Sequence, residues 1–280
     1  MTDVRPDLHS HSTASDGMLS PRALVERAAA AGITHLAITD HDNFSGTDSL
    51  RGESLPIPVL PGVELSIKDM KGLHLLGYGL GDAPELRQKV ADLAQKRLSR
   101  AKIMVEKLAA LGMPLDYEAI AAQAQGSVGR PHIARAMLER GYISRFDEAF
   151  TKWIGDDGPA YYAGEKLTMA EALPLMRRSG FIPVLAHPAE LEKDDLTLRA
   201  LIEAWQERGL MGVEVYHPTM IRKGFARLDA MVRGMGLLVT GGSDFHVDGD
   251  KHGALGCVLP GWQRRNEDFA ALMAAMGRAE

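Results

Sequence analysis

The sequence predicts an α/β fold, with a parallel sheet that is wrapped by helices and closed, or nearly closed, into a barrel. Short apolar runs typical of strands alternate with helical patterns in residues 1–82 and again in residues 163–280. Such alternation with short loops favours strands that are joined through helices. Residues 83–162 show helical patterns and no evident strand, so we expect a helical insertion within one large domain of this 280-residue chain.

The N-terminal part predicts four strands and one helix. A short strand ends at residues 7–9, and a helix is expected over residues 21–31. Ser20 is a plausible N-cap of this helix, Pro21 suits its first position, and Gly32 follows its end. Further strands are expected at residues 34–39, 59–65 and 72–78.

The remaining elements follow from the same periodicities. Within the insertion, a long amphipathic helix rich in Ala, Lys and Arg is expected over residues 86–111, followed by shorter helices at 117–123, 131–139 and 146–153. The alternation then resumes, with helices expected at 169–179, 196–208, 221–235 and 266–278, and strands at 181–186, 212–216 and 237–240.

Composition limits the class of protein. The formal net charge of -5 does not suit a protein whose whole surface binds nucleic acid, although a local basic groove for a phosphorylated ligand is compatible with it. The single cysteine, Cys257, excludes a disulfide framework and favours a reducing cytoplasm; its apolar neighbours predict a buried strand thiol. No signal peptide and no run of about 18 apolar residues is evident, so we expect no membrane contact.

The positions of the histidines point to a functional site. Of the ten histidines, His74 lies within a predicted strand and several others lie where a predicted strand ends or just beyond it. In parallel α/β folds the carboxyl ends of the strands are where sites are built. The histidines at these ends are His9, His11, His41, His187, His217 and His246.

Carboxylates accompany these histidines. Asp16 follows the first pair, Glu64 lies at a strand, and Asp244 stands two residues before His246. Imidazole and carboxylate together are the ligands of first-row cations such as Zn, Mn or Fe. Two or three cations in one site repel each other and need a bridging carboxylate, for which Glu64 is the natural candidate. A metal-free hydrogen-bond network would bury many ionisable groups at a high cost.

The motifs that hold these residues resemble the successive motifs of the PHP (polymerase and histidinol phosphatase) family. They are DLHSHSTASDG (7–17), ITDHD (38–42), PGVELS (61–66), HLLGYG (74–79), LAHP (185–188) and GSDFH (242–246). The resemblance covers the predicted core and implies a distorted seven-stranded β/α barrel, related to the amidohydrolases, with a trinuclear metal centre. It also implies a metal-dependent phosphoesterase.

The resemblance implies a role for each candidate ligand. One cation would bind His9, His11 and Asp244, with Glu64 bridging to a second cation held by His74 and His187. A third would bind Asp16, His41 and His246. All nine positions have the residue type that the family requires, so we expect an active enzyme that holds two or three divalent cations. Manganese is the first expectation, with zinc or iron as alternatives.

The insertion resembles that of the subgroup that acts on nucleoside 3',5'-bisphosphates, which also includes enzymes that trim RNA from its 5' end. The segment GRPHIA (129–134) places Arg130 and His132 at a helix start, where free backbone N–H groups favour a phosphate. Arg97, Arg100 and Lys102 are additional candidates for phosphate contacts, although long helices commonly carry solvated cations. The expected reaction removes the 3'-phosphate of a small nucleotide and leaves the 5'-mononucleotide. No obligate protein partner is evident.

Several alternatives remain open at the level of sequence. The sugar oxygen that departs needs a proton, for which His217 and Asp244 are both candidates. A 5'-to-3' exoribonuclease on short RNA could share this site, whereas a histidinol-phosphate phosphatase would call for an acidic recognition pocket. A non-catalytic metal-binding module is the alternative from another class, and the complete ligand set argues against it.

Overall fold

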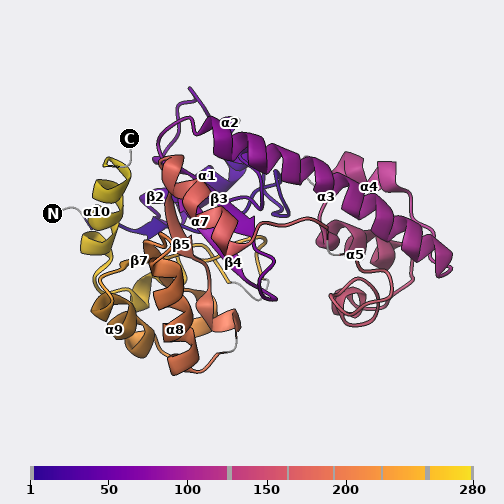
Figure 1. Ribbon diagram of the computed structural model, residues 1–280. Coiled ribbons are helices and arrows are strands. Elements are labelled where there is room, and N and C mark those ends of the chain that lie inside the picture. The colour runs from indigo at the N-terminus through magenta and orange to yellow at the C-terminus, as the bar shows by residue number, and fades with distance from the viewer. Residues whose placement is uncertain are drawn as a thin grey trace.

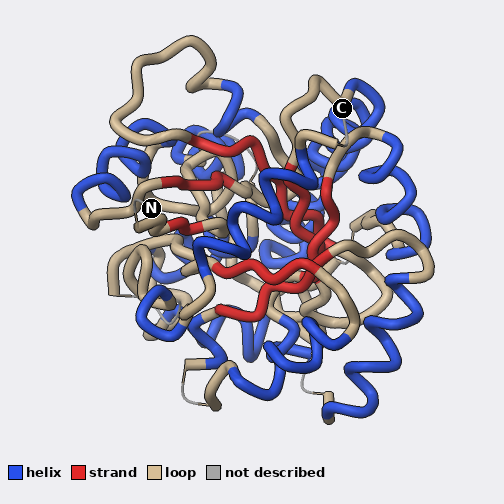
Figure 2. Tube along the Cα trace, turned by 90° about the vertical axis from the view of Figure 1, so that its left-hand side faces the viewer, coloured by secondary structure: helices blue, strands red, loops and turns tan. Residues whose placement is uncertain are grey.

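The computed structural model describes residues 3–124, 128–162, 164–191, 193–221, 223–249 and 253–278, without the side chains of residues 94–99. Seven strands form one sheet in chain order, and the helices surround it (Figure 2). The Leu8 N–H donates to the Gly241 carbonyl at 3.1 Å, so β1 and β7 meet and the sheet is a nearly closed barrel. The strands are β1 (Pro6–Asp7), β2 (His35–Ile38), β3 (Val59–Ser66), β4 (His74–Tyr78), β5 (Ile182–Leu185), β6 (Gly212–Tyr216) and β7 (Leu238–Gly241).

One strand departs from the expected parallel arrangement. β4 pairs antiparallel with both β3 and β5, whereas the other neighbouring strands pair in parallel. The expectation of a parallel sheet is therefore wrong for β4, while the expected barrel is confirmed. The connection over residues 67–73 is too short for the helical crossover that parallel strands require, so the chain turns back as a hairpin. As a result, the first residue of β4, His74, lies opposite Ser66 at the end of β3.

Helices cover the outside of the barrel much as their periodicity predicts. In α1, the Ser20 hydroxyl accepts a hydrogen bond from the Ala23 N–H, as expected of an N-cap. The helix expected at 221–235 begins later, because Gly224 has a φ of +79° that interrupts helical geometry. The outer helices are α1 (Pro21–Ala30), α2 (Ser45–Asp48), α7 (Met169–Arg178), α8 (Asp195–Gln206), α9 (Ala226–Gly234) and α10 (Arg265–Met276). Among the described residues, no helix has both the length and the apolar character that a bilayer-spanning segment needs.

Two local expectations require correction. The short helix α2, with the sequence Ser-Gly-Thr-Asp, has no apolar periodicity and was not predicted. Cys257 lies in a turn rather than a strand and is only half-buried. The neighbouring Gly256 has a φ of +70°, which favours a turn over extended backbone at this point.

The helices of residues 84–153 pack beside the barrel (Figure 1). From residue 101 onward they enclose their own hydrophobic cluster, which includes Met104, Leu108, Ile133, Met137 and Ile154. The barrel residues form a separate cluster, which the start of the long helix joins through Leu86, Val90 and Leu93. Two cores support our proposal that residues 1–82 and 163–280 form the barrel and residues 83–162 an insertion. The helices are α3 (Pro84–Ala110), α4 (Tyr117–Gln123), α5 (Arg130–Glu139) and α6 (Phe146–Glu148), followed by a π-helical turn (Ala149–Trp153).

Candidate metal centre

The nine candidate ligands gather at one edge of the barrel. Each comes from the carboxyl end of a parallel strand, from the loop after it, or, for His74, from the start of the antiparallel strand. Parallel strands deliver their carboxyl ends to the same edge, which is why residues far apart in the sequence meet here. The group consists of His9, His11, Asp16, His41, Glu64, His74, His187, Asp244 and His246.

The first cluster comprises His9, His11, Glu64 and Asp244. The two histidine Nε2 atoms lie 3.4 and 3.3 Å from Glu64 Oε2, and 3.3 and 3.1 Å from Asp244 Oδ1. Atoms bound about 2.0–2.2 Å from one cation are separated by about 3.0–3.5 Å, so these spacings suit a shared ion. Among the described residues, His9 Nε2, His11 Nε2 and Glu64 Oε2 are buried and have no hydrogen-bond partner. The cluster therefore fits a cation.

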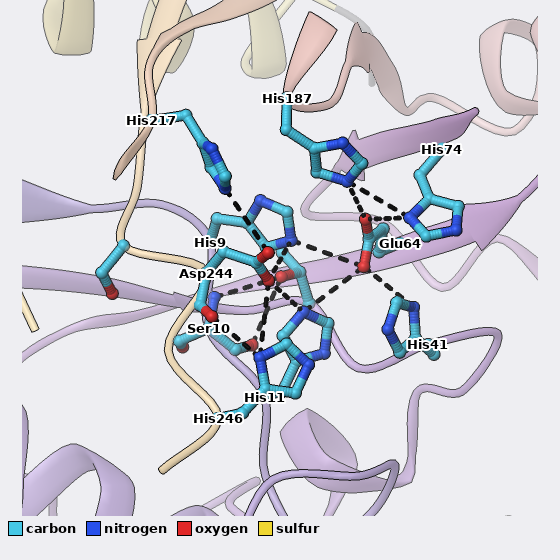
Figure 3. A network of polar contacts seen from close by, with 12 residues as sticks. His9, Ser10, His11, His41, Glu64, His74, His187, His217, Asp244 and His246 are labelled. Carbon is cyan, nitrogen blue, oxygen red and sulfur yellow. Dashed lines mark hydrogen bonds and ion pairs between the residues drawn. The ribbon is translucent and has the colours of Figure 1, made fainter. Parts of the chain in front are cut away.

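A second cluster uses the other oxygen of Glu64. Its Oε1 lies 2.8 Å from His74 Nδ1 and 3.0 Å from His187 Nε2, and these two nitrogens are 3.2 Å apart. Figure 3 shows His74 and His187 on one side of the Glu64 carboxylate and His41 on the other. Because its two oxygens belong to different clusters, Glu64 has the geometry that a bridging ligand needs, and we propose it as the bridge.

A third, more open cluster contains His11, Asp16, His41 and His246. Asp16 Oδ1 lies 3.3 Å from His246 Nε2, and Asp16 Oδ2 lies 3.8 Å from His41 Nε2. The His11 ring stacks on the His246 ring with centroids 4.2 Å apart, which joins this cluster to the first. We propose Asp16, His41 and His246 as the ligands of a third cation.

The electrostatics of the site require positive charge. Burial raises the pKa of Glu64, but the imidazoles of His41, His74 and His9 bring it well below its usual range. Burial also raises the pKa of Asp244, and His9 and His246 bring it well below its usual range. Both carboxylates are therefore ionised in a buried site, where uncompensated charge is unfavourable. Divalent cations would supply that compensation.

A fourth acidic residue, Glu214, contacts two of the candidate ligands from the side away from the clusters. It is fully buried in β6; its Oε1 lies 3.0 Å from His9 Nδ1, and its Oε2 accepts a hydrogen bond of 2.9 Å from the His187 N–H. Carboxylates in this position fix the ring orientation of metal-binding histidines. Glu214 was not predicted from the sequence, although a lone acidic residue within an apolar strand was a usable signal.

Replacing Glu214 with Gln is expected to lower the affinity for Mn²⁺ by about 10–100-fold. The amide has a single acceptor oxygen, so it cannot accept from both the His9 ring and the His187 N–H. Calorimetric titration of metal-free protein would measure the change. An unchanged affinity in a variant that keeps its circular dichroism spectrum would contradict a supporting role.

His217 lies behind Asp244. Its Nε2 is 3.4 Å from Asp244 Oδ2, its Nδ1 is 2.8 Å from the Thr219 hydroxyl, and its side chain is fully buried. Both ring nitrogens are thus engaged within the protein. This geometry favours a positioning role for His217, whereas Asp244 is itself a member of the first cluster.

The loops that carry the ligands are fixed by buried hydrogen bonds. Asp40 accepts bonds from the Ser12 N–H at 2.8 Å and from the Ser15 hydroxyl at 2.6 Å, which holds the loop between His11 and Asp16. Gly242 precedes the Asp244 loop, and a side chain there would meet the backbone nitrogen of His9 at 2.4 Å. Only glycine permits this close approach.

A pocket beside the third cluster is lined from both parts of the chain. The barrel contributes Asp16, His41 and His74, and the other lining residues are Ser66, Arg100, Gly129, Arg130, Pro131, Phe150 and Lys166. The predicted phosphate-binding residues Arg100 and Arg130 therefore lie next to the candidate ligands. Lys166 adds a third cation that the sequence analysis did not single out.

The two arginines are held in place by the insertion. Arg130 Nη1 donates to Asp156 Oδ1 at 2.7 Å, and its guanidinium lies 5.6 Å from the Tyr161 ring centroid. Arg100 Nε donates to the Tyr162 carbonyl at 2.6 Å, while its buried Nη2 has no hydrogen-bond partner among the described residues. Guanidinium donors beside a metal site suit an anionic ligand.

Among the described residues, the others predicted to contact the substrate do not line the pocket. His132 Nδ1 accepts a hydrogen bond of 3.0 Å from the Gly129 N–H at the start of α5. One of its two ring nitrogens therefore caps the helix and is not free to contact a substrate. Lys102 Nζ lies 3.7 Å from Glu118 and outside the pocket lining. The side chain of Arg97 lies outside the described residues.

The chain resembles known proteins over most of its length. The PHP domain family matches residues 7–140. The chain is 30% identical to the 5'-3' exoribonuclease of Haemophilus influenzae, covering 92% of this chain and 98% of that protein. It is 29% identical to the 3',5'-nucleoside bisphosphate phosphatase of Chromobacterium violaceum, covering 87% and 88%.

A solved structure supports the same conclusion. The crystal structure of a putative metal-dependent phosphoesterase from Bifidobacterium adolescentis superimposes with a TM-score of 0.82 at 28% identity and covers 96% of both chains. The barrel, the clustered imidazoles and carboxylates, and the relatives agree with one another. This chain belongs to the PHP domain family and is a metal-dependent phosphoesterase.

Proposed function

We propose that this enzyme hydrolyses the 3'-phosphate of nucleoside 3',5'-bisphosphates and releases 5'-mononucleotides. The observation that carries the proposal is the pocket in which Arg100, Arg130 and Lys166 lie beside Asp16, His41 and His74. It offers a second site for an anion directly next to the clusters that suit cations. A substrate with two phosphates would use both sites, whereas one with a single phosphate would leave one of them unused.

The metal centre and the arginines would each bind one of the two phosphates of the substrate. Bound divalent cations would lower the pKa of water and neutralise the oxygens of the phosphate to be removed. Arg130 would clamp the remaining 5'-phosphate through two N–H groups, which fixes orientation as well as charge. Arg100 would donate to the same phosphate from its unpartnered Nη2. Asp244, as a carboxylate, would accept a proton from the attacking water and pass it to the departing sugar oxygen.

The same features indicate which cations the reaction needs and where in the cell it takes place. We propose two or three cations, with manganese as the first choice, because the clusters combine imidazole and carboxylate donors. The insertion would bind the 5'-phosphate of the substrate through Arg100 and Arg130. A cytoplasmic location is supported by the single cysteine, and a small phosphorylated nucleotide is the only partner that the proposal requires.

A 5'-to-3' exoribonuclease is the second candidate function. The Haemophilus influenzae relative carries that name, and cleavage after a 5'-terminal nucleotide would use the same two anion sites. Short RNA would differ only in carrying more chain beyond the phosphate that is attacked. The two functions therefore use the same site and differ in the leaving part of the substrate: the bisphosphate carries nothing beyond the attacked phosphate, whereas RNA carries further nucleotides.

Purified protein supplied with Mn²⁺ should be assayed for release of phosphate and of 5'-mononucleotide. The substrates are adenosine 3',5'-bisphosphate, adenosine 5'-monophosphate, histidinol phosphate and a short 5'-phosphorylated RNA. We expect the highest kcat/KM on the bisphosphate, since it fills both anion sites. A preference for either monophosphate would refute the proposal, and a preference for the RNA would favour the second candidate.

A further inference from the structure

An aromatic side chain of the insertion faces the arginine pocket, which Arg100 and Arg130 line together with residues of the metal centre. Phe150 is the one phenylalanine, tyrosine or tryptophan of the described lining. It is half-buried, because it packs partly against the hydrophobic cluster of the insertion and keeps part of its surface accessible. An apolar ring offers no hydrogen-bond donor to a phosphate. Its accessible surface therefore suits a different part of the ligand.

The local backbone holds Phe150 in this position. The residue lies in the π-helical turn Ala149–Trp153, and such turns are frequent at functional sites. Gly155 follows the turn, and a side chain there would clash with the Phe150 carbonyl oxygen, so glycine is required to keep this shape. The turn packs against α5, which begins at Arg130. The ring and the guanidinium are therefore presented to the pocket from neighbouring elements.

A second ring extends the aromatic surface beyond the pocket. The centroid of the Phe146 ring lies 5.5 Å from that of Phe150, and the two rings are inclined by 54°. Aromatic rings attract each other at this spacing. Phe146 is 39% exposed and lies outside the described lining of the pocket. The pair thus continues from the arginine pocket onto the exposed surface of the insertion.

The substrate of the proposed function has one part that neither anion site binds. With its 3'-phosphate at the metal centre and its 5'-phosphate at the arginines, the base is left without a partner. A base has two flat faces that stack on aromatic side chains. We propose that Phe150 is the stacking platform for the base, and that it makes the enzyme select nucleoside bisphosphates over bisphosphates that have no base. This inference rests on the proposed function, because it keeps both phosphates where that function places them.

Stacking determines what kind of selectivity to expect. It uses the face of the base and does not read the hydrogen-bonding groups on its edge, so all four bases should be accepted. Purines should give a higher kcat/KM than pyrimidines, because the larger ring system overlaps more of Phe150. Assays on the four nucleoside 3',5'-bisphosphates check this expectation. Selection of a single base would contradict stacking as the means of recognition.

The main test removes the aromatic ring and the base separately. Wild type and Phe150→Leu are assayed with Mn²⁺ on adenosine 3',5'-bisphosphate and on the 3,5-bisphosphate of methyl ribofuranoside, which has the sugar and both phosphates but no base. The measured quantity is the ratio of the two kcat/KM values. We expect this ratio to fall by about tenfold or more in Phe150→Leu. Phe150→Tyr keeps a flat ring and should retain most of the wild-type ratio.

Tyr142→Leu is the matched control. Tyr142 also packs against the hydrophobic cluster of the insertion, but it lies outside the described lining of the pocket. This variant should keep the wild-type ratio. It separates the loss of a ring at the pocket from a general loosening of the insertion.

Several results would overturn the inference. They are an unchanged ratio in Phe150→Leu, an equal fall in Tyr142→Leu, or a fall in Phe150→Tyr as large as that in Phe150→Leu. Wild-type enzyme that hydrolyses both substrates equally well would overturn it and leave the proposed function intact. If wild type hydrolyses neither substrate, the proposed function fails. The calorimetric affinities for the two compounds then decide, and tighter binding of the nucleotide that Phe150→Leu abolishes would still support the platform, whereas equal affinities would overturn it.

Discussion

Replacing Glu64 with Gln is expected to abolish hydrolysis of every substrate and to lower the metal content of the protein. Glu64 is fully buried, and its two oxygens face different clusters at 2.8–3.4 Å from five histidines. An amide has no charge to offset two neighbouring cations, and its nitrogen cannot act as a ligand. Since a bound cation contributes several kcal/mol to the transition state, we expect kcat to fall by at least about 10³-fold.

The measurement combines metal analysis of the purified variant with phosphate release from adenosine 3',5'-bisphosphate and from an aryl phosphate. Asp69→Asn provides a matched control, because Asp69 follows β3 near the same edge and its carboxylate accepts a hydrogen bond of 2.8 Å from the Met169 N–H. That control should keep its cations and its activity. Full activity in Glu64→Gln would remove the bridging assignment.

Replacing Arg130 with Ala is expected to raise KM for nucleoside 3',5'-bisphosphates by about 10–100-fold, since a hydrogen bond to a charged group contributes about 1.5–3 kcal/mol. The side chain is 29% exposed and lines the pocket beside His41 and His74. An aryl phosphate has no second phosphate for Arg130 to bind. Its hydrolysis should therefore continue at the wild-type rate.

Two further variants sharpen this prediction. Arg130→Lys keeps the charge but loses the paired N–H groups, so it should restore only part of the affinity. Asp156→Asn keeps Arg130 while it weakens the ion pair that orients it, and its effect should be smaller than that of Arg130→Ala. Equal losses on the bisphosphate and the aryl phosphate in Arg130→Ala would refute a clamp on the second phosphate.

The sequence by itself determined much of this protein. Strand patterns ended at histidines and carboxylates, and because parallel strands deliver their carboxyl ends to one edge, the convergence of His9, His41, His187 and Asp244 followed from the pattern. Helix bounds such as those of α4 (Tyr117–Gln123) also followed, since apolar periodicity is a local signal.

Only the tertiary structure decided the rest. The antiparallel direction of β4 depends on the length of its connection, and it places His74 at the centre from the start of a strand. Glu214 gains its role from contacts with His9 and His187, which lie 205 and 27 residues away in the chain. The meeting of Lys71 with Asp156, and of Asp156 with Arg130, depends on how the insertion packs against the barrel. Such contacts between distant residues are set by the packing of two cores, and no local pattern of side chains encodes that packing.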